Sequence, residues 1–297
     1  MKKWGFLFLI LLCLSLTIIF YEPLNEPKIE IEKEGQQAIV PVEGNRTSES
    51  IQSIEITEEQ IFEGNLLLVN SDNPVQKESI KSDVINLSTQ NELIDGFGLI
   101  DSGVDLSEEI ARNFSRMVEL AEKDGVSNFV ITSGFRDFAE QSVLYQEMGS
   151  DYALPAGYSE HNLGLSLDIG STQTKMAEAP EGKWIEENAW KYGFVLRYPK
   201  DKVEITGIQY EPWHIRYVGL PHSAIMKEKN FVLEEYLAYL KEVKHISATI
   251  DGEKYKISYY SLSENRTINI PNDQFVEISG NNMDGVIVTV QDMYSME

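Results

Sequence analysis

The apolar residues of this chain recur at spacings that predict a mixture of helices and short strands. Between Ser107 and Lys123 they repeat every three or four residues, behind a serine that can cap the first helical turn. By the same spacing, and with Gly149 as one helix stop, helices are expected at 107–123, 139–148, 184–192 and 231–242. Short apolar or alternating runs predict strands at 66–70, 129–132, 163–169, 209–218, 246–250, 255–260, 267–270 and 286–290. The expected fold class is α+β: a small antiparallel sheet with flanking helices, followed by a small C-terminal β segment.

The first residues have a different pattern. Lys2 and Lys3 precede an uncharged, mostly apolar stretch of 18 residues, Trp4–Tyr21, which is just long enough to span a bilayer as a helix. The two lysines predict that this end stays in the cytoplasm and that the remainder is exported. A cleaved signal peptide is the alternative, but no Ala-x-Ala-like site follows the stretch. We therefore expect residues 1–21 to anchor a single-pass protein in the cell membrane, with its catalytic part outside.

The composition after this stretch divides the rest of the chain. Residues 22–59 are rich in Glu, Pro, Gln, Ser and Asn with isolated Ile and Val, which predicts a flexible stalk. The periodic helices and strands then occupy residues 60–245, which are expected to form the main domain. Residues 246–297 are expected to form a small β appendage, in which no chemistry is apparent.

Charge and cysteine content exclude several classes of function. The chain carries 25 basic and 48 acidic residues, a formal net charge of −23, which argues against binding to nucleic acid. Its single cysteine, Cys13, lies inside the apolar stretch. A disulfide framework, a cysteine-rich zinc site and a thiol nucleophile are therefore excluded.

Candidate chemistry is concentrated in two short segments, Ser159–Asp168 and Glu211–His214. Together they supply two imidazoles and one carboxylate that can hold a divalent metal, with a second carboxylate beside them. A catalytic zinc site takes three protein ligands of this kind and keeps one position open for water. A lone histidine is more often a packed or surface residue than a ligand, so the combination carries the prediction. The other two histidines are explained otherwise, His222 by a helix start and His245 by a helix end.

Strand parity constrains how these residues could meet. In the alternating run 163–169, Asp168 is on the open face of the predicted strand. His161 has the opposite parity, so it must lie in the turn before that strand. Glu211 and His214 also differ in parity, and a bulge at Pro212 would let them converge.

Four motifs resemble a known family: Ser133-Gly134-Phe135-Arg136-Asp137, Gly157-Tyr158-Ser159-Glu160-His161, Gly164-Leu165-Ser166-Leu167-Asp168 and Glu211-Pro212-Trp213-His214-Ile215-Arg216-Tyr217. Their order and spacing are similar to those of VanY-type zinc D-alanyl-D-alanine carboxypeptidases, a peptidase family that also contains zinc D,D-dipeptidases. Two positions depart from the common pattern: Asn162 stands where many members carry Gln, and Ser166 where many carry Ala. Neither is a ligand position, so the departures bear on fine specificity.

The resemblance implies a role for each candidate residue. His161, Asp168 and His214 are expected to bind one Zn²⁺, and Glu211 to act as the general base. Arg136 is expected to steady the oxyanion or the substrate carbonyl, with an ion pair to Asp137 as the alternative. The residues implied to line the substrate site are Gln141, Tyr158 and Ser159, the last of which could equally be a turn or capping residue.

The implied activity is removal of the C-terminal D-alanine from peptidoglycan pentapeptide precursors, with a contribution to glycopeptide (vancomycin) resistance and cell-wall metabolism. The expected partners are peptidoglycan peptides ending in D-Ala-D-Ala and, through the N-terminal helix, the membrane. A serine-type enzyme is excluded because neither Ser-x-x-Lys nor Lys-Thr-Gly occurs. Two alternatives stay open: a D,D-dipeptidase or L,D-cleaving relative, and a non-catalytic cell-wall-binding module of the same fold.

Overall fold

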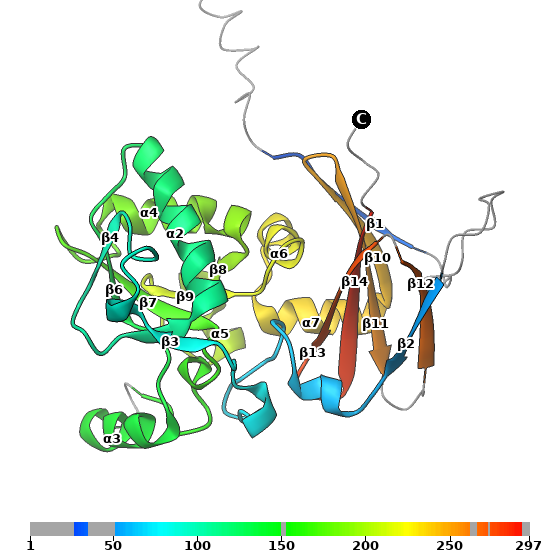
Figure 1. Cartoon of the computed structure of the whole chain (residues 1–297), viewed down its shortest axis with the longest axis horizontal. Coiled ribbons are helices and arrows are strands. Elements are labelled where there is room, and N and C mark those ends of the chain that lie inside the picture. The colour runs from blue at the N-terminus through cyan, green and yellow to red at the C-terminus, as the bar shows by residue number, and fades with distance from the viewer. Residues whose placement is uncertain (1–26, 35–50, 150–152, 262–265, 273, 293–297) are drawn as a thin grey trace, which may run out of the picture.

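The computed structural model describes residues 27–34, 51–149, 153–261, 266–272 and 274–292. Two five-stranded sheets dominate the molecule, one in each half of Figure 1, and helices α6 (His222–Lys229) and α7 (Leu233–Val243) lie between them. The expected α+β class, with antiparallel sheets and flanking helices, is therefore confirmed.

The first sheet carries the candidate site residues. Its strand order is β4-β6-β7-β9-β8, and every pairing is antiparallel except that of β4 with β6. The strands are β4 (Phe97–Leu99), β6 (Phe129–Ser133), β7 (Ser166–Ser171), β8 (Phe194–Leu196) and β9 (His214–Tyr217). A separate two-stranded ladder joins β3 (Val84–Asn86) to β5 (Asp105–Ser107). In the register of the first sheet, Asp168 on β7 lies between Ser133 of β6 and His214 of β9.

Helices occur in this part of the chain where the sequence predicted them. Helix α2 (Glu108–Lys123) begins after Ser107, whose hydroxyl accepts a hydrogen bond from the Ile110 amide, and its apolar stripe is buried in the core. Helix α3 (Phe138–Met148) ends at Gly149, as expected. The predicted helix 184–192 is two consecutive elements, α4 (Pro180–Asn188) and the 3-10 turn η5 (Ala189–Tyr192), and a short α5 (Val203–Thr206) follows.

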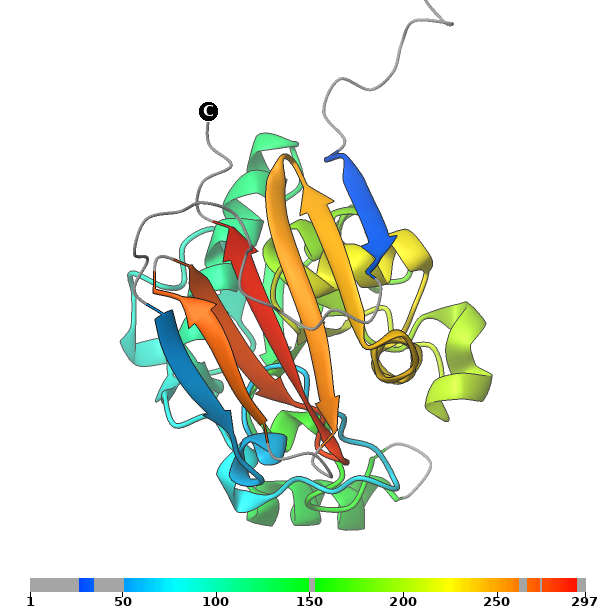
Figure 2. The ribbon, with the colours of Figure 1, turned by 90° about the vertical axis from the view of Figure 1, so that its right-hand side faces the viewer.

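The second sheet has the order β1-β10-β11-β14-β13, and all its pairings are antiparallel. Its strands are β1 (Ile29–Lys33), β10 (His245–Ile250), β11 (Glu253–Ser261), β13 (Phe275–Gly280) and β14 (Gly285–Asp292). A further pair, β2 (Ile51–Ile56) with β12 (Arg266–Pro271), lies beside it (Figure 2). One apolar cluster joins the sheet to α6 and α7, and a second joins it to the β2–β12 pair. Strand β14 is therefore buried on both faces over most of its length.

Three sequence predictions need correction. Within the predicted stalk 22–59, strands β1 and β2 pair with C-terminal strands, because their alternating isoleucines cover apolar positions of that sheet. Residues 66–70, expected as a strand, have no strand partner, because side chains of Arg216, Ser279 and Asn282 bind their backbone instead. The expected strand 209–218 is shortened to β9, and Glu211 lies in a turn before it rather than in a bulge.

The predicted single-pass membrane localisation must also be corrected. None of the helices in the described residues is long and apolar enough to cross a membrane. The predicted anchor itself, residues 1–21, lies outside the described residues.

Candidate metal centre and active site

Three local structures bring His161, Asp168 and His214 together. His161 lies in the 3-10 turn η4 (Glu160–Asn162), and the hydroxyl of Ser159 caps this turn by accepting a hydrogen bond from the His161 amide. Asp168 is on β7, and His214 opens the neighbouring strand β9. The turn before the strand that parity required for His161 is thus present, and sheet register pairs the other two residues directly.

The donor atoms of these three residues lie close to one another. Each offers one atom, and these atoms all lie within 4.8 Å of one another. His161 Nε2 is 3.3 Å from Asp168 Oδ2, and His214 Nδ1 is 2.9 Å from Asp168 Oδ1. Two imidazoles and one carboxylate at this spacing match the donor set of a catalytic zinc site, whose ligands lie about 2.0–2.2 Å from the ion. The residues present therefore fit a single divalent metal ion.

A backbone carbonyl orients His161. Its Nδ1 lies 2.6 Å from the carbonyl oxygen of Gly134, in the loop after β6, which leaves Nε2 to face Asp168. A Cβ atom at Gly134 would lie 2.1 Å from the carbonyl oxygen of Asp105, so no larger residue fits there. Gly134 thus lets this loop pack directly against the backbone of Asp105. The same glycine provides the carbonyl that orients His161.

The charges of the cluster are strongly coupled. Burial alone would raise the pKa of Asp168, but the two histidines hold it well below its ordinary value. Burial alone would lower the pKa of His214, but contacts with Asp168 and Glu160 raise it to about 9 in the metal-free protein. Negative charge therefore outweighs burial around His214, as a cation-binding site requires.

Glu211 lies beside this cluster but is not one of the three residues whose donor atoms form it. Its Oε2 atom is 3.9 Å from His214 Nδ1, and its side chain keeps 27% of its surface exposed. The residue is held by a hydrogen bond from its amide to the Tyr198 carbonyl, and its own carbonyl accepts one from the His214 amide. Burial raises the pKa of Glu211 above its ordinary value, which brings it toward the range useful for a general base.

Arg136 has an unpartnered buried donor. Its Nε atom is buried without a hydrogen-bond partner among the described residues, and burial lowers its pKa although Asp168, Glu140 and Glu211 oppose this. The alternative ion pair with Asp137 does not form, because that carboxylate caps α3 by accepting from the Glu140 amide at 2.8 Å. The guanidinium of Arg136 therefore forms no ion pair with Asp137 and keeps one N–H without an acceptor among the described residues.

The three residues expected to line the substrate site have different surroundings. Gln141 is buried and donates from Nε2 to the Leu154 carbonyl at 2.7 Å, while its Oε1 has no partner in the described residues. Ser159 caps the turn that carries His161, in agreement with the alternative prediction that Ser159 is a turn or capping residue. Tyr158 is partly buried, and its amide donates to the Pro155 carbonyl, the one hydrogen bond found for it among the described residues. Structural roles are thus evident for Gln141 and Ser159.

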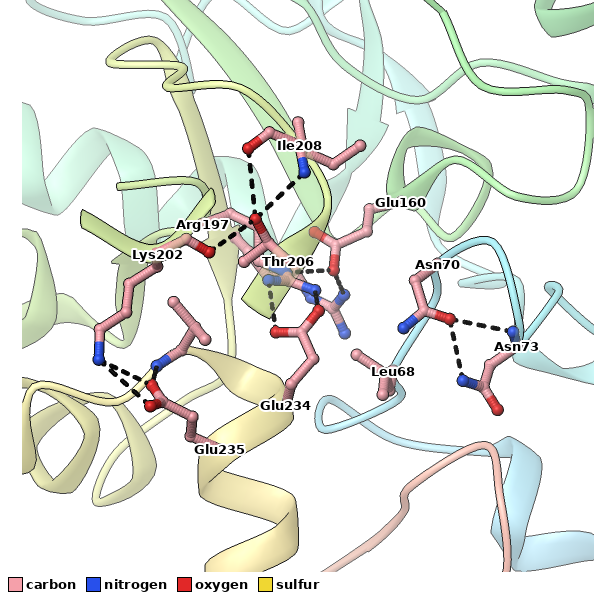
Figure 3. A network of polar contacts seen from close by, with 12 residues as sticks. Leu68, Asn70, Asn73, Glu160, Arg197, Lys202, Thr206, Ile208, Glu234 and Glu235 are labelled. Atoms are coloured by element: carbon pink, nitrogen blue, oxygen red, sulfur yellow. Dashed lines mark hydrogen bonds and ion pairs between the residues drawn. The ribbon is translucent and has the colours of Figure 1, made fainter. Parts of the chain in front are cut away.

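Sequence reasoning missed a buried charge cluster behind His214. Glu160 contacts Arg197 and Arg216 at 2.8 Å each, and all three side chains are at most 1% exposed. Arg197 continues to Glu234 on α7 through two hydrogen bonds of 2.7 and 2.9 Å (Figure 3). Burial would raise the pKa of Glu160, but the two arginines hold it well below its ordinary value. The one available signal was an acidic residue next to His161 in an otherwise uncharged turn.

Comparison with known proteins places this site in a family. A profile described as VanY, D-alanyl-D-alanine carboxypeptidase, matches residues 103–220, which include all eight candidate residues. A D-alanyl-D-alanine carboxypeptidase of Enterococcus faecium is 63% identical over 295 residues, covering 98% of this chain and 96% of that protein. The chain belongs to the VanY family of carboxypeptidases.

Two further relatives show how much of this VanY-family chain shares the likeness. The bifunctional D-Ala-D-Ala dipeptidase and D-Ala-D-Ala carboxypeptidase VanXYC of Enterococcus gallinarum is 35% identical over 196 residues, covering 60% of this chain and 95% of that protein. The crystal structure of the vancomycin resistance D,D-dipeptidase VanXYg, in complex with a D-Ala-D-Ala phosphinate analogue, aligns with a TM-score of 0.71 at 30% identity. The alignment covers 82% of this chain and all of that structure, so the shared fold extends beyond the profile match.

Proposed function

We propose that this VanY-family carboxypeptidase is a zinc-dependent D,D-carboxypeptidase that removes the C-terminal D-alanine from peptidoglycan pentapeptide precursors. Through this activity it would contribute to glycopeptide resistance and cell-wall metabolism. The observation that carries the proposal is the cluster of His161, Asp168 and His214, whose donor atoms lie within 4.8 Å of one another, with Glu211 beside it.

In this proposal His161, Asp168 and His214 hold one Zn²⁺, and Glu211 stays outside the ligand set. When bound, the ion would supply a Lewis acid and would make a water molecule acidic enough, with a pKa of about 7, to react at neutral pH. Glu211 accepts the proton of the attacking water and returns a proton to the departing amine, which leaves poorly unless it is protonated. The raised pKa of Glu211 favours the first step, because a more basic carboxylate takes up the proton of the water more readily.

Arg136 stabilises the negative charge that develops on the carbonyl oxygen during the attack. Its buried, unpartnered Nε supports this role, since a fixed cation in a partly dry site interacts more strongly with a developing oxyanion than with a neutral carbonyl. Tyr158, together with Gln141 and Ser159, is proposed to line the pocket for the terminal residue. The side chains of Gln141 and Ser159 form hydrogen bonds within the protein, whereas no such bond is found for the Tyr158 side chain among the described residues.

Metal removal and a single substitution test this function. The full chain should release D-alanine from a pentapeptide ending in D-Ala-D-Ala, lose this activity to a chelator and regain it with zinc. Glu211→Ala should lower turnover by about 10²–10⁴-fold, the usual contribution of a general acid–base residue, while its zinc content stays at one ion per chain. Glu147→Ala, at an exposed carboxylate on α3, serves as the control and should keep normal activity. Activity that survives complete chelation, or loss of zinc from Glu211→Ala, would refute the assigned roles.

A second activity is favoured by one specific finding. The D,D-dipeptidase VanXYg aligns with 82% of this chain, including regions outside the VanY profile match. Cleavage of the free D-Ala-D-Ala dipeptide is therefore the second candidate. Comparing kcat/KM for the dipeptide and the pentapeptide separates the two, because a carboxypeptidase should strongly prefer the longer peptide.

A further inference from the structure

The two histidines of the candidate metal centre present different ring nitrogens to Asp168. His161 faces it with Nε2, whereas His214 faces it with Nδ1. A neutral imidazole carries its proton on one nitrogen, and the partner of that nitrogen decides which one is left to bind a metal. For His161 the partner is the Gly134 carbonyl, 2.6 Å from Nδ1. His214 needs an acceptor on its opposite nitrogen, Nε2.

The group in that position is the carboxylate of Glu160. His214 Nε2 is buried and makes no hydrogen bond within the described residues, and Glu160 Oε2 lies 3.5 Å from it. A buried N–H without an acceptor destabilises the fold, so this carboxylate is its natural acceptor. We propose that Glu160 is a positioning residue, which keeps the proton of His214 on Nε2 and so directs Nδ1 toward the metal. This inference rests on the proposed metal site.

The carboxylate of Glu160 is fixed from several sides. Its Oε1 contacts Arg197 Nε and Arg216 Nη1 at 2.8 Å each, and its Oε2 accepts a hydrogen bond from Ser166 Oγ at 3.0 Å. Arg216 is anchored in turn by hydrogen bonds from Nη2 to the carbonyls of Asn65 and Leu67. Because these contacts occupy both oxygens, rotation of Glu160 away from His214 would separate the carboxylate from Arg216 and leave Arg197 with Glu234 as its remaining carboxylate partner.

The same cluster connects the metal centre to a helix outside the matched family segment. Arg197 lies between the carboxylates of Glu160 and Glu234, and it binds the latter through Nη1 and Nη2 at 2.9 and 2.7 Å (Figure 3). Glu234 is on α7, beyond residues 103–220. Glu234 contacts Arg197 but not Glu160 or His214, so it offers a matched control with the same charge.

The wild-type protein provides the most direct test. Nuclear magnetic resonance of the zinc-loaded chain, with ¹⁵N-labelled histidine, distinguishes the two ring nitrogens of each residue, and the sequence has only four histidines to assign. We expect His214 to carry its proton on Nε2 and bind zinc through Nδ1, and His161 to show the reverse. Zinc binding by His214 through Nε2 would overturn this inference alone, whereas absence of any zinc binding would overturn the proposed function together with it.

Substitution then measures the contribution of Glu160. Glu160→Gln should weaken zinc binding by roughly 10- to 100-fold, the usual effect of removing an outer partner of a ligand, as determined by competition with a chelator. Glu234→Gln should change the zinc affinity by less than about threefold, which is well below the effect expected for loss of an outer partner of a ligand. A folded Glu160→Gln protein, judged by circular dichroism, with unchanged zinc affinity would contradict the proposal. If this variant does not fold, the wild-type resonance assignment decides the question.

Discussion

Two buried histidines, His214 and His222, show how neighbouring groups decide what one side chain does. His214 has carboxylates near both ring nitrogens, and in the metal-free protein these raise its pKa to about 9 against the effect of burial. Within the described residues, the ring of His222 has only hydroxyl partners, Tyr236 at 2.8 Å and Thr289 at 3.1 Å, and burial lowers its pKa to about 3. The first environment suits a cation, and the second requires a neutral ring.

The low pKa of His222 predicts a pH dependence of stability. The unfolded chain binds a proton at His222 near pH 6.5 and the folded chain only near pH 3. The unfolded state therefore gains protons first, and folded stability falls as the pH drops from 6.5 toward 3, by at most about 1.4 kcal/mol per pH unit from this group. Replacing the histidine by His222→Gln removes this term, so the variant should lose less stability than wild type between pH 6 and pH 4. Urea unfolding of the metal-free proteins at both pH values measures the difference, and equal losses would contradict the prediction.

At the residue scale, short motifs carried most of the information in the sequence. His161, Asp168 and His214 could be predicted to share one metal ion because their motifs resemble those of a known family, although His214 is 46 residues from Asp168, and the structure brings their donor atoms within 4.8 Å of one another. The cluster around Glu160 could not be predicted, because Arg197 is 37 residues from Glu160 and 37 from Glu234. Charged residues so far apart are expected at the surface unless the fold is known.

At the scale of elements, α3 depends on its ends more than on its packing. Gln141 is its only buried residue, so the helix gains little from an apolar face. A capping box holds its start, in which the Asp137 carboxylate accepts from the Glu140 amide and the Glu140 carboxylate accepts from the Asp137 amide. Arg136 immediately precedes this cap, so its backbone position depends on a correct helix start.

Loss of the cap should therefore affect both stability and substrate binding. Asp137→Ala should lower the free energy of unfolding by about 1 kcal/mol, the typical cost of an N-cap deletion, and raise KM for the pentapeptide because Arg136 loses its fixed position. Asp137→Asn keeps a capping side chain of similar strength and should leave both quantities close to wild type. Denaturant unfolding and steady-state kinetics provide the two measurements. Equal behaviour of the two variants would argue that the cap does not hold Arg136.

Helices could be predicted from the sequence more reliably than strands, and the reason is physical. The stripe of α2 and the Gly149 stop of α3 are local signals, and both were confirmed. Strand β1 is separated from its partner β10 by most of the chain, so no local pattern revealed the pairing. Strand β13 was not predicted although it contains three apolar residues, Phe275, Val276 and Ile278, and most of its length is only partly buried.

At the scale of the whole molecule, the C-terminal sheet is packed against the part that carries the metal centre. One apolar cluster contains Leu66, Leu68, Trp190 and Val218 together with residues of α6, α7, β10, β11 and β14. Residues 66–70 link the halves through their backbone, since Arg216 binds the Leu67 carbonyl from one side and Asn282 binds the Leu68 carbonyl from the other. The two sheets should therefore unfold together.

Asn282 allows this cooperativity to be tested with little change to the backbone. Its φ of 60° is a left-handed conformation that glycine adopts easily, and its Nδ2 donates to the carbonyls of Leu68 at 2.8 Å and Pro74 at 3.0 Å. Asn282→Gly should lower the free energy of unfolding by about 1–3 kcal/mol, because buried carbonyls lose their donor. Met283→Ala, at an exposed neighbour, is the control and should have little effect.

The probes must report on different halves for this result to reveal coupling. Trp184 and Trp213 lie in the half with the metal centre and Trp190 lies in the apolar cluster between the halves, so tryptophan fluorescence follows that half and its boundary, whereas far-ultraviolet circular dichroism follows both sheets. In a cooperative molecule the two unfolding curves coincide in wild type and shift together in Asn282→Gly. If the C-terminal sheet were independent, the fluorescence curve would stay in place while only part of the dichroism signal moved. We expect the coincident shift, because the contacts of Asn282 end on the segment that also anchors Arg216, and through it Glu160 and the metal centre.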